Sequence, residues 1–231
     1  YKGRYGAPRI HDELKDRSVI CGRKRVARLM RENRIMAKAS RKFKATTNSK
    51  HSYPVHPNLL NQRFTCSAPN KVWTTDISYI WTGEGWLYLA VVLDMYSRRI
   101  VGWAMDKSMT RRLAMSALAM AYWHRKPAAG LTHHSDRGSQ YASFDYQNML
   151  KDFGMVCSMS SKGNCYDNSV TETFFHTLKT ELIYGERYVT RERAKSDIFS
   201  YIEEFYNRKR KHSTLGYCSP VKFEQYYGLV A

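Results

Sequence analysis

The chain has 231 residues, of which 43% are hydrophobic and 13% aromatic, and this composition excludes a disordered protein. Its formal net charge of +18 indicates a polyanionic partner, for which nucleic acid is the first candidate. No run approaches the roughly 20 apolar residues that cross a bilayer, and no segment resembles a signal peptide, so a membrane protein is not expected.

Residues 1–45 are predicted to form a small basic module with a helix-turn-helix-like fold. The first 50 residues contain 16 lysines and arginines against 4 acids. One helix can open at Ala7-Pro8, and a second spans 23–33, where Val26, Leu29 and Met30 make an apolar stripe. Four arginines lie largely off that stripe and are predicted to contact DNA phosphates: Arg23, Arg25, Arg28 and Arg31. The alternative is a basic helix that is merely solvated.

A proline-containing linker is expected over 46–70, followed by the main domain over 71–185. The pattern of β-branched, aromatic and apolar residues predicts strands at 72–81, 86–94, 98–105, 131–134 and 155–159. Helices are expected from a cap at Thr110 to about His124, from a cap at Ser143 to about Phe153, and from Asp167 onward. A C-terminal helical extension over 186–231 contains one further helix at about 191–207, with Ile198, Ile202 and Phe205 as its apolar stripe.

Three acids are the candidate site. Asp76 lies within the first strand, Asp136 directly follows the fourth, and Glu172 lies near the head of the helix after the fifth; thirty-five residues separate Asp136 from Glu172. Carboxylates brought together resist ionisation unless cations compensate them, and Mg²⁺ prefers such oxygen ligands. We therefore hypothesise two divalent ions, Mg²⁺ or Mn²⁺, with Asp76 shared between them, Asp136 on one and Glu172 on the other.

The helix that carries Glu172 has two distinct faces. Phe174, Leu178 and Leu182 recur at helical spacing and should be buried. His176 and Lys179 share the face of Glu172, and both are predicted to meet DNA beside the scissile bond. The preceding Lys162-Gly163-Asn164 is predicted to be a mobile loop.

The remaining acids and histidines of this region are assigned ordinary roles. Asp94, Asp145 and Asp167 are expected to be loop or cap acids. His133 and His134 are neighbours on a strand, so at most one of them can face the acids, and neither suits an oxygen-ligand site. The five cysteines contain no Cys-x-x-Cys pair, which predicts free thiols in a reducing cytosol.

Several ordered blocks resemble the bacterial insertion-sequence transposases related to retroviral integrases, the D,D(35)E group. These are Trp73-Thr74-Thr75-Asp76-Ile77-Ser78-Tyr79, His134-Ser135-Asp136-Arg137-Gly138-Ser139-Gln140-Tyr141, Asp167-Asn168 through Glu172, and Leu178-Lys179-Thr180-Glu181. The tail, Tyr206-Asn207 through Arg210, His212 and Leu215-Gly216-Tyr217, is also similar, and we predict DNA contacts from Arg210 and His212. Ser169 stands where relatives often have alanine. The resemblance implies an RNase H-like five-stranded mixed sheet flanked by helices, with Asp76, Asp136 and Glu172 as metal ligands.

It further implies metal-dependent DNA cleavage and strand transfer, a homo-oligomer on DNA, and a site of action at the bacterial nucleoid in the cytoplasm. Relatives usually act as fusions with an upstream-frame helix-turn-helix and coiled-coil segment, and because the chain begins at Tyr1 we expect upstream sequence. Two alternatives stay open at this stage: a non-catalytic DNA-binding repressor form of a transposase, and an RNase H-like nuclease without strand transfer.

Overall fold

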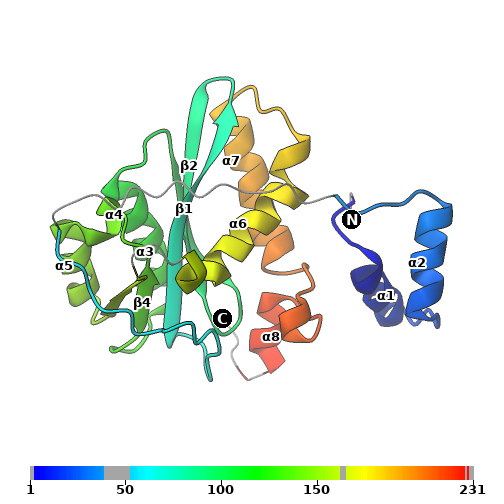
Figure 1. Cartoon of the computed structure of the whole chain (residues 1–231), viewed down its shortest axis with the longest axis horizontal. Coiled ribbons are helices and arrows are strands. Elements are labelled where there is room, and N and C mark those ends of the chain that lie inside the picture. Colours follow the sequence, from blue (N-terminus) through cyan, green and yellow to red (C-terminus); the bar gives the residue numbers. More distant parts are fainter. Residues whose placement is uncertain (1–2, 39–52, 162–164, 227, 229–231) are drawn as a thin grey trace.

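A five-stranded mixed sheet forms the centre of the molecule (Figure 1). The computed structural model describes residues 3–38, 53–161, 165–226 and 228, so the predicted loop at 162–164 and part of the predicted linker lie outside the described residues. The strands are β1 (Val72–Thr82), β2 (Gly85–Asp94), β3 (Ile100–Asp106), β4 (Thr132–Ser135) and β5 (Val156–Met159). Their order is β3-β2-β1-β4-β5; the first three are antiparallel, and β4 and β5 run parallel to β1. The predicted RNase H-like sheet is confirmed.

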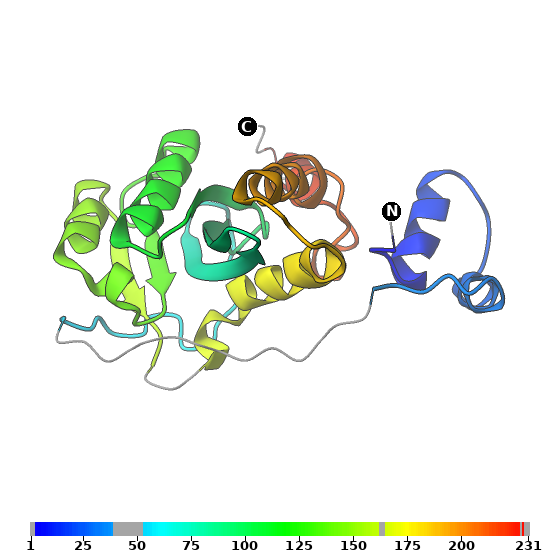
Figure 2. The same ribbon diagram turned by 90° about the horizontal axis from the view of Figure 1, so that it is seen from above.

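Helices cover both faces of this sheet (Figures 1 and 2). One face packs against α3 (Arg111–Arg125), α4 (Ser139–Ala142) and α5 (Phe144–Asp152) in a core that includes Trp73 and Leu118. The approach of α3 is very close, because a Cβ on Gly102 of β3 would lie 2.3 Å from the carbonyl oxygen of Ala117. This position therefore accepts only glycine.

The other face packs against α6 (Ser169–Glu181), which follows the 3-10 turn Cys165–Asn168, and against α7 (Arg191–Ser200). The expected apolar stripes are buried here, with Leu178 and Ile198 both fully inaccessible. The helix predicted at 191–207 continues beyond α7 as a π-helical segment, Tyr201–Tyr206. A second 3-10 turn, Ile183–Gly185, joins α6 to the strand-like chain before α7.

The C-terminal helix α8 (Pro220–Tyr226) is anchored by one buried acid. Glu224 is 1% exposed and accepts hydrogen bonds from Arg99 Nη1 (2.6 Å) and from Arg125 Nη1 and Nη2 (3.0 and 2.8 Å). Arg99 lies just before β3 and Arg125 ends α3, so a single carboxylate joins the C-terminal helix to the edge strand and to the helix that covers one face of the sheet. A buried, hydrogen-bonded ion pair of this kind fixes geometry more than it adds stability.

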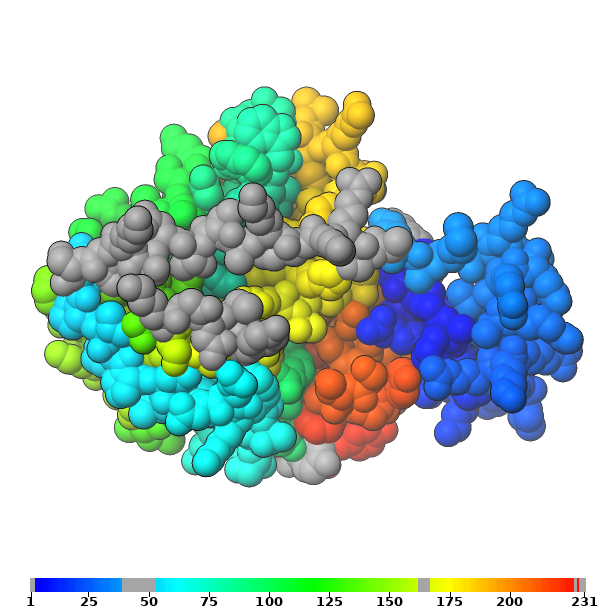
Figure 3. All heavy atoms as spheres, viewed as in Figure 1, coloured from blue at the N-terminus to red at the C-terminus, as the bar shows by residue number. Residues whose placement is uncertain are grey.

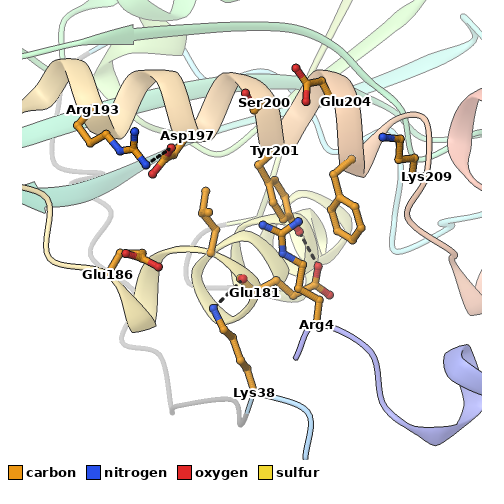
Figure 4. Close-up of a pocket in the computed structure, with 12 residues that line it drawn as sticks. Arg4, Lys38, Glu181, Glu186, Arg193, Asp197, Ser200, Tyr201, Glu204 and Lys209 are labelled. Atoms are coloured by element: carbon orange, nitrogen blue, oxygen red, sulfur yellow. Dashed lines mark hydrogen bonds and ion pairs between the residues drawn. The ribbon is translucent and has the colours of Figure 1, made fainter. Parts of the chain in front are cut away.

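The N-terminal module consists of α1 (Ala7–Asp16) and α2 (Arg23–Glu32), and it rests on the C-terminal extension through α1. Arg9 Nε donates to the carbonyl oxygen of Lys211 (2.9 Å), and the Lys211 ammonium pairs with Asp12 and Asp16. The segment before α1 inserts Arg4 into a pocket of about 360 Å³ that Glu181, Tyr201 and Phe205 help to line (Figure 4). The guanidinium of Arg4 lies 4.4 Å from the centre of the Phe205 ring.

Candidate active site

Asp76 and Asp136 lie level with each other on adjacent strands. The parallel register of β1 and β4 pairs Val72 with Thr132 and Thr74 with His134, and β4 then ends at Ser135. Extension of the register by two residues beyond the pair of Thr74 and His134 brings Asp136, just after the end of β4, beside Asp76. Neighbouring strands are about 4.8 Å apart, so the two acids are close together. The Asp136 side chain is held in place by the N–H of Gly138, which donates to its Oδ1 at 2.9 Å.

Glu172 is brought to the same place by two buried contacts of the chain around it. Thr171 Oγ1 donates to Thr74 Oγ1 (2.7 Å), and Asn168 Nδ2 donates to the carbonyl oxygen of Thr75 (3.0 Å). Both contacts fix the first turn of α6 on β1, one or two residues from Asp76. Sequence reasoning missed Asn168 and Thr171, because a threonine or asparagine near a helix start usually signals capping, not packing on a strand.

The charges of the three acids are strongly coupled. The pKa of Asp76 is raised well above its ordinary value by burial, then by the neighbouring Asp136, with a smaller contribution from Glu172. The pKa of Glu172 is also raised, by burial and by Asp136. The phenol of Tyr141 lies behind these acids at 2% exposure, and burial followed by the charge of Asp76 raises its pKa well above normal. These carboxylates therefore form a negative centre that lacks sufficient positive compensation from the protein.

Lys179 acts on this centre, because its charge lowers the pKa of Asp76, and it is not a surface residue. Its side chain is buried, with Nζ 5.0 Å from the centre of the Tyr79 ring. Burial lowers the pKa of Lys179 to about 8, although Asp76 opposes this shift. His176, one turn earlier in α6, is exposed. Both residues lie on the helix row of Glu172, and their predicted DNA contacts stay predictions.

Arg210 and His212 occupy a different environment. Arg210 is 5% exposed and donates from Nε and Nη2 to the carboxylate of Glu181, at 3.0 and 2.7 Å. His212 is 8% exposed, and burial followed by Arg210 and two further arginines lowers its pKa well below normal. Their side chains are largely used in packing the C-terminal extension, and their predicted DNA contacts stay predictions. The four arginines of α2, in contrast to Arg210, are exposed: Arg23, Arg25, Arg28 and Arg31.

The acids and histidines assigned ordinary roles are engaged within the fold. Asp94 ends β2 fully buried and accepts from the N–H of Asn70 (2.7 Å) and Tyr96 (2.9 Å). His133 and His134 are also fully buried, and burial lowers their pKa values to about 3 and about 4. His133 is hydrogen-bonded to Tyr146 of α5 (3.1 Å). The remaining two acids, Asp145 and Asp167, pair with Arg111 and with the N–H of Ser161.

No three His, Cys, Asp or Glu side chains gather around one point closely enough to hold a metal ion, within the part of the chain that the structure describes. Within the same residues, no helix is long and apolar enough to cross a membrane.

The sheet order and two family matches identify an integrase core domain. Residues 67–165 and 172–226 each match a family described as "Integrase core domain", and residues 1–43 match an "HTH-like domain". Among solved structures, the chain is similar to a chain of the simian T-cell lymphotropic virus intasome in complex with PP2A regulatory subunit B56 gamma (TM-score 0.59, 17% identity, 94% of this chain and 74% of that one). It is also similar to the catalytic core domain of BIV integrase (TM-score 0.52, 18% identity, 69% and 96%).

Relatives of much higher identity specify the family. The chain is 51% identical to an IS600 insertion-element protein of Shigella sonnei, over 98% of this chain and 84% of that one. It is 50% identical to the transposase InsF for insertion sequence IS3A of Escherichia coli (strain K12), over 96% and 77%. The chain therefore belongs to the family of insertion-sequence transposases with an integrase core, whose activity is DNA transposition.

Proposed function

We propose that Asp76, Asp136 and Glu172 are the catalytic carboxylates of this transposase, and that they act with divalent cations, Mg²⁺ or Mn²⁺. The observation that carries the proposal is the convergence of the three acids from β1, the end of β4 and the first turn of α6. Asp136 raises the pKa values of both Asp76 and Glu172. The family of the chain, transposases with an integrase core, is consistent with a metal-dependent site of this kind.

The donor set fits such ions. All three side chains supply carboxylate oxygens, the ligands that Mg²⁺ prefers, and the raised pKa values of Asp76 and Glu172 favour a cation that keeps them ionised. Asp76 would be shared by two ions, with Asp136 on one and Glu172 on the other. Ions held there supply Lewis-acid activation of the attacking oxygen and stabilisation of the leaving oxygen at a phosphodiester.

The other residues of the site position these carboxylates and the DNA. Thr171 and Asn168 hold Glu172 against β1, and Gly138 fixes the Asp136 carboxylate through its N–H. Lys179 lies beside Asp76 and carries a positive charge below about pH 8, so it suits a DNA phosphate next to the scissile bond. The exposed arginines of α2 supply sequence-independent phosphate contacts.

The proposal is tested on purified chain with DNA that carries the element ends. Asp136→Asn is expected to abolish Mg²⁺-dependent nicking and joining, and also the rise in Tm that Mg²⁺ or Mn²⁺ produces in the wild type. Asp145→Asn is the matched control, because Asp145 is an exposed acid paired with Arg111 outside the site. Wild-type cleavage by Asp136→Asn would show that the assignment is wrong.

The same assay separates the two alternatives. Cleavage without joining identifies an RNase H-like nuclease, whereas salt-sensitive binding without cleavage under any divalent metal identifies a repressor form. We further propose that the chain acts on DNA as a homo-oligomer at the nucleoid in the bacterial cytoplasm, because transposition must hold two ends together. Sedimentation of the complex with paired ends, compared with one end alone, measures that assembly.

A further inference from the structure

A second cavity lies on another flank of α6, away from the row of Glu172. It has a volume of about 310 Å³ and is bounded by α6, the segment around Phe64, and the 3-10 turn Ser213–Leu215. In Figure 3 the yellow of α6, the cyan of residues 53–70 and the orange of the C-terminal extension meet on the face turned toward the viewer. This volume is at the lower end of the range for ligand pockets, which suits a small group.

The lining of this pocket is strongly positive. Arg9, Arg98 and Arg210 contribute to it together with His212, whereas no Asp or Glu is among the described residues that line it. Glu181 is paired with Arg210 at 2.7 Å and with Arg9 at 3.9 Å, and the buried Asp94 acts on the charge of Arg98, so two acids face three guanidinium groups. The depressed pKa of His212, to which all three arginines contribute after burial, reflects the same excess of positive charge.

The three arginines are held in position by the fold. Arg98 Nη2 donates to the carbonyl oxygen of Phe64 (3.1 Å), and Arg9 Nε donates to that of Lys211 (2.9 Å). Arg210 is fixed by Nε and Nη2 on Glu181. Since a guanidinium has five N–H donors, each arginine keeps further donors after these contacts. Groups fixed in this way lose little freedom when an anion binds.

Neutral donors and an apolar wall complete the pocket. Hydroxyl groups come from two elements, α6 and the C-terminal turn: Ser169, Thr173, Thr177, Ser213 and Thr214. The apolar part of the lining includes Phe64, Val170 and Phe174. Arginine forks match the oxygens of a phosphate, and an aromatic and aliphatic wall suits the sugar that is attached to it.

We propose that this pocket binds one phosphodiester and its deoxyribose from the DNA strand that runs past α6. The proposal rests on the proposed function, which supplies the DNA. An α-helix is about 10–12 Å across with its side chains, and successive phosphates of one strand are about 3.4 Å apart along a duplex. The helix width is an upper limit on this separation, so the bound phosphate would lie within about three or four nucleotides of the scissile one. It would fix the DNA on the helix that carries Glu172.

The test places a negative charge at the mouth of the pocket without removing a buried group. Ser213→Glu does so, because Ser213 is exposed at the first position of its turn, where an acid is tolerated. Ser108→Glu is the matched control, an exposed serine in the loop between β3 and α3 that does not line the pocket. Both are made in the Asp136→Asn background and measured with a chelator, so that DNA affinity is read without cleavage.

Loss of one phosphate contact lowers DNA affinity by about eightfold at about 0.1 M salt and reduces the slope of log affinity against log salt by about one. Ser213→Glu should show both effects and Ser108→Glu neither. A single neutral methylphosphonate can be placed at each position along each DNA strand in turn. At one position it should lower the affinity of the wild-type chain by the same factor as Ser213→Glu does. A methylphosphonate at that position should not lower the affinity of Ser213→Glu any further.

Equal affinities of the two glutamate variants, or additive effects of Ser213→Glu and every methylphosphonate, would overturn the proposal and leave the cavity a packing feature. A wild-type chain that binds in this way but never cleaves DNA would instead contradict the proposed catalytic function, while the pocket would stand.

Discussion

The buried hydrogen bond between Thr171 and Thr74 is the contact that attaches the first turn of α6 to β1, and it gives a quantitative test of the site. The two side chains are 0% and 1% exposed, and their Oγ1 atoms are 2.7 Å apart. Thr171→Val keeps the shape of the side chain but leaves the Thr74 hydroxyl without this donor. An unsatisfied buried hydroxyl lowers the free energy of unfolding by about 1–3 kcal/mol. In a chain of this size, each kcal/mol lowers Tm by about 2–4 °C.

The double variant Thr74→Val/Thr171→Val removes both hydroxyls, and replacement of both partners by apolar groups of the same shape is nearly neutral. We therefore expect its free energy of unfolding to lie above that of Thr171→Val, with a coupling energy of about 1 kcal/mol or more. Urea denaturation of the wild type, the two single variants and the double variant measures this cycle. Additive losses in the cycle would refute the reasoning.

Thr173→Val is the matched control for this cycle. Thr173 is exposed in the same helix and its Oγ1 donates only to the carbonyl oxygen of Ser169, so its replacement should change stability by less than about 0.5 kcal/mol. Strand cleavage reports the second consequence. Because Thr171 adjoins Glu172, a displacement of about 1 Å at the carboxylate in Thr171→Val lowers cleavage by about 100-fold.

Three further predictions concern buried charges. Glu224→Gln leaves Arg99 and Arg125 without their carboxylate and should lower the free energy of unfolding, measured in urea, by about 3–5 kcal/mol. The pKa of Glu224 is lowered in the folded chain, so its contribution to stability is lost as pH falls. The loss caused by the variant should therefore be smaller at pH values below the ordinary pKa of glutamate. The affinity for DNA should fall as pH rises through about 8, because Lys179 loses its proton there. Lys179→Gln should remove this pH dependence of DNA affinity without lowering Tm. His133 has a pKa of about 3 when folded, so the unfolded chain binds more protons below about pH 6.5; stability should fall as pH drops, and His133→Gln should flatten the curve.

Local sequence patterns were sufficient for the secondary structure that carries the site. The alternation around Asp76 and the helical spacing of Phe174 and Leu178 depend on periods of two and 3.6 residues, which are visible in any short window. The expected strand ends differ from the observed ones by two residues at most. The short α4 and the terminal α8 were not anticipated, since four and seven residues give too few turns for a pattern.

The environments of the charged side chains were not predictable in this way. Lys179 shares a helical row with Glu172, which indicated an exposed DNA contact, yet it is buried beside Tyr79. Arg210 belongs to a strongly basic tail, and its buried partner Glu181 lies 29 positions away. No local window contains both partners of such a pair, and the net charge of a segment does not reveal which of its members the fold neutralises.

The sequence by itself therefore determined the order of the strands and helices, the basic character and the identity of the three acids, because each depends on residue type and short-range spacing. Only the tertiary structure decided how the acids meet. The parallel register of β1 and β4 places Asp136 beside Asp76, and the contacts of Asn168 and Thr171 place Glu172 there. The same packing decided that three arginines distant in the chain converge on one pocket, since burial and long-range pairing are properties of the folded chain alone.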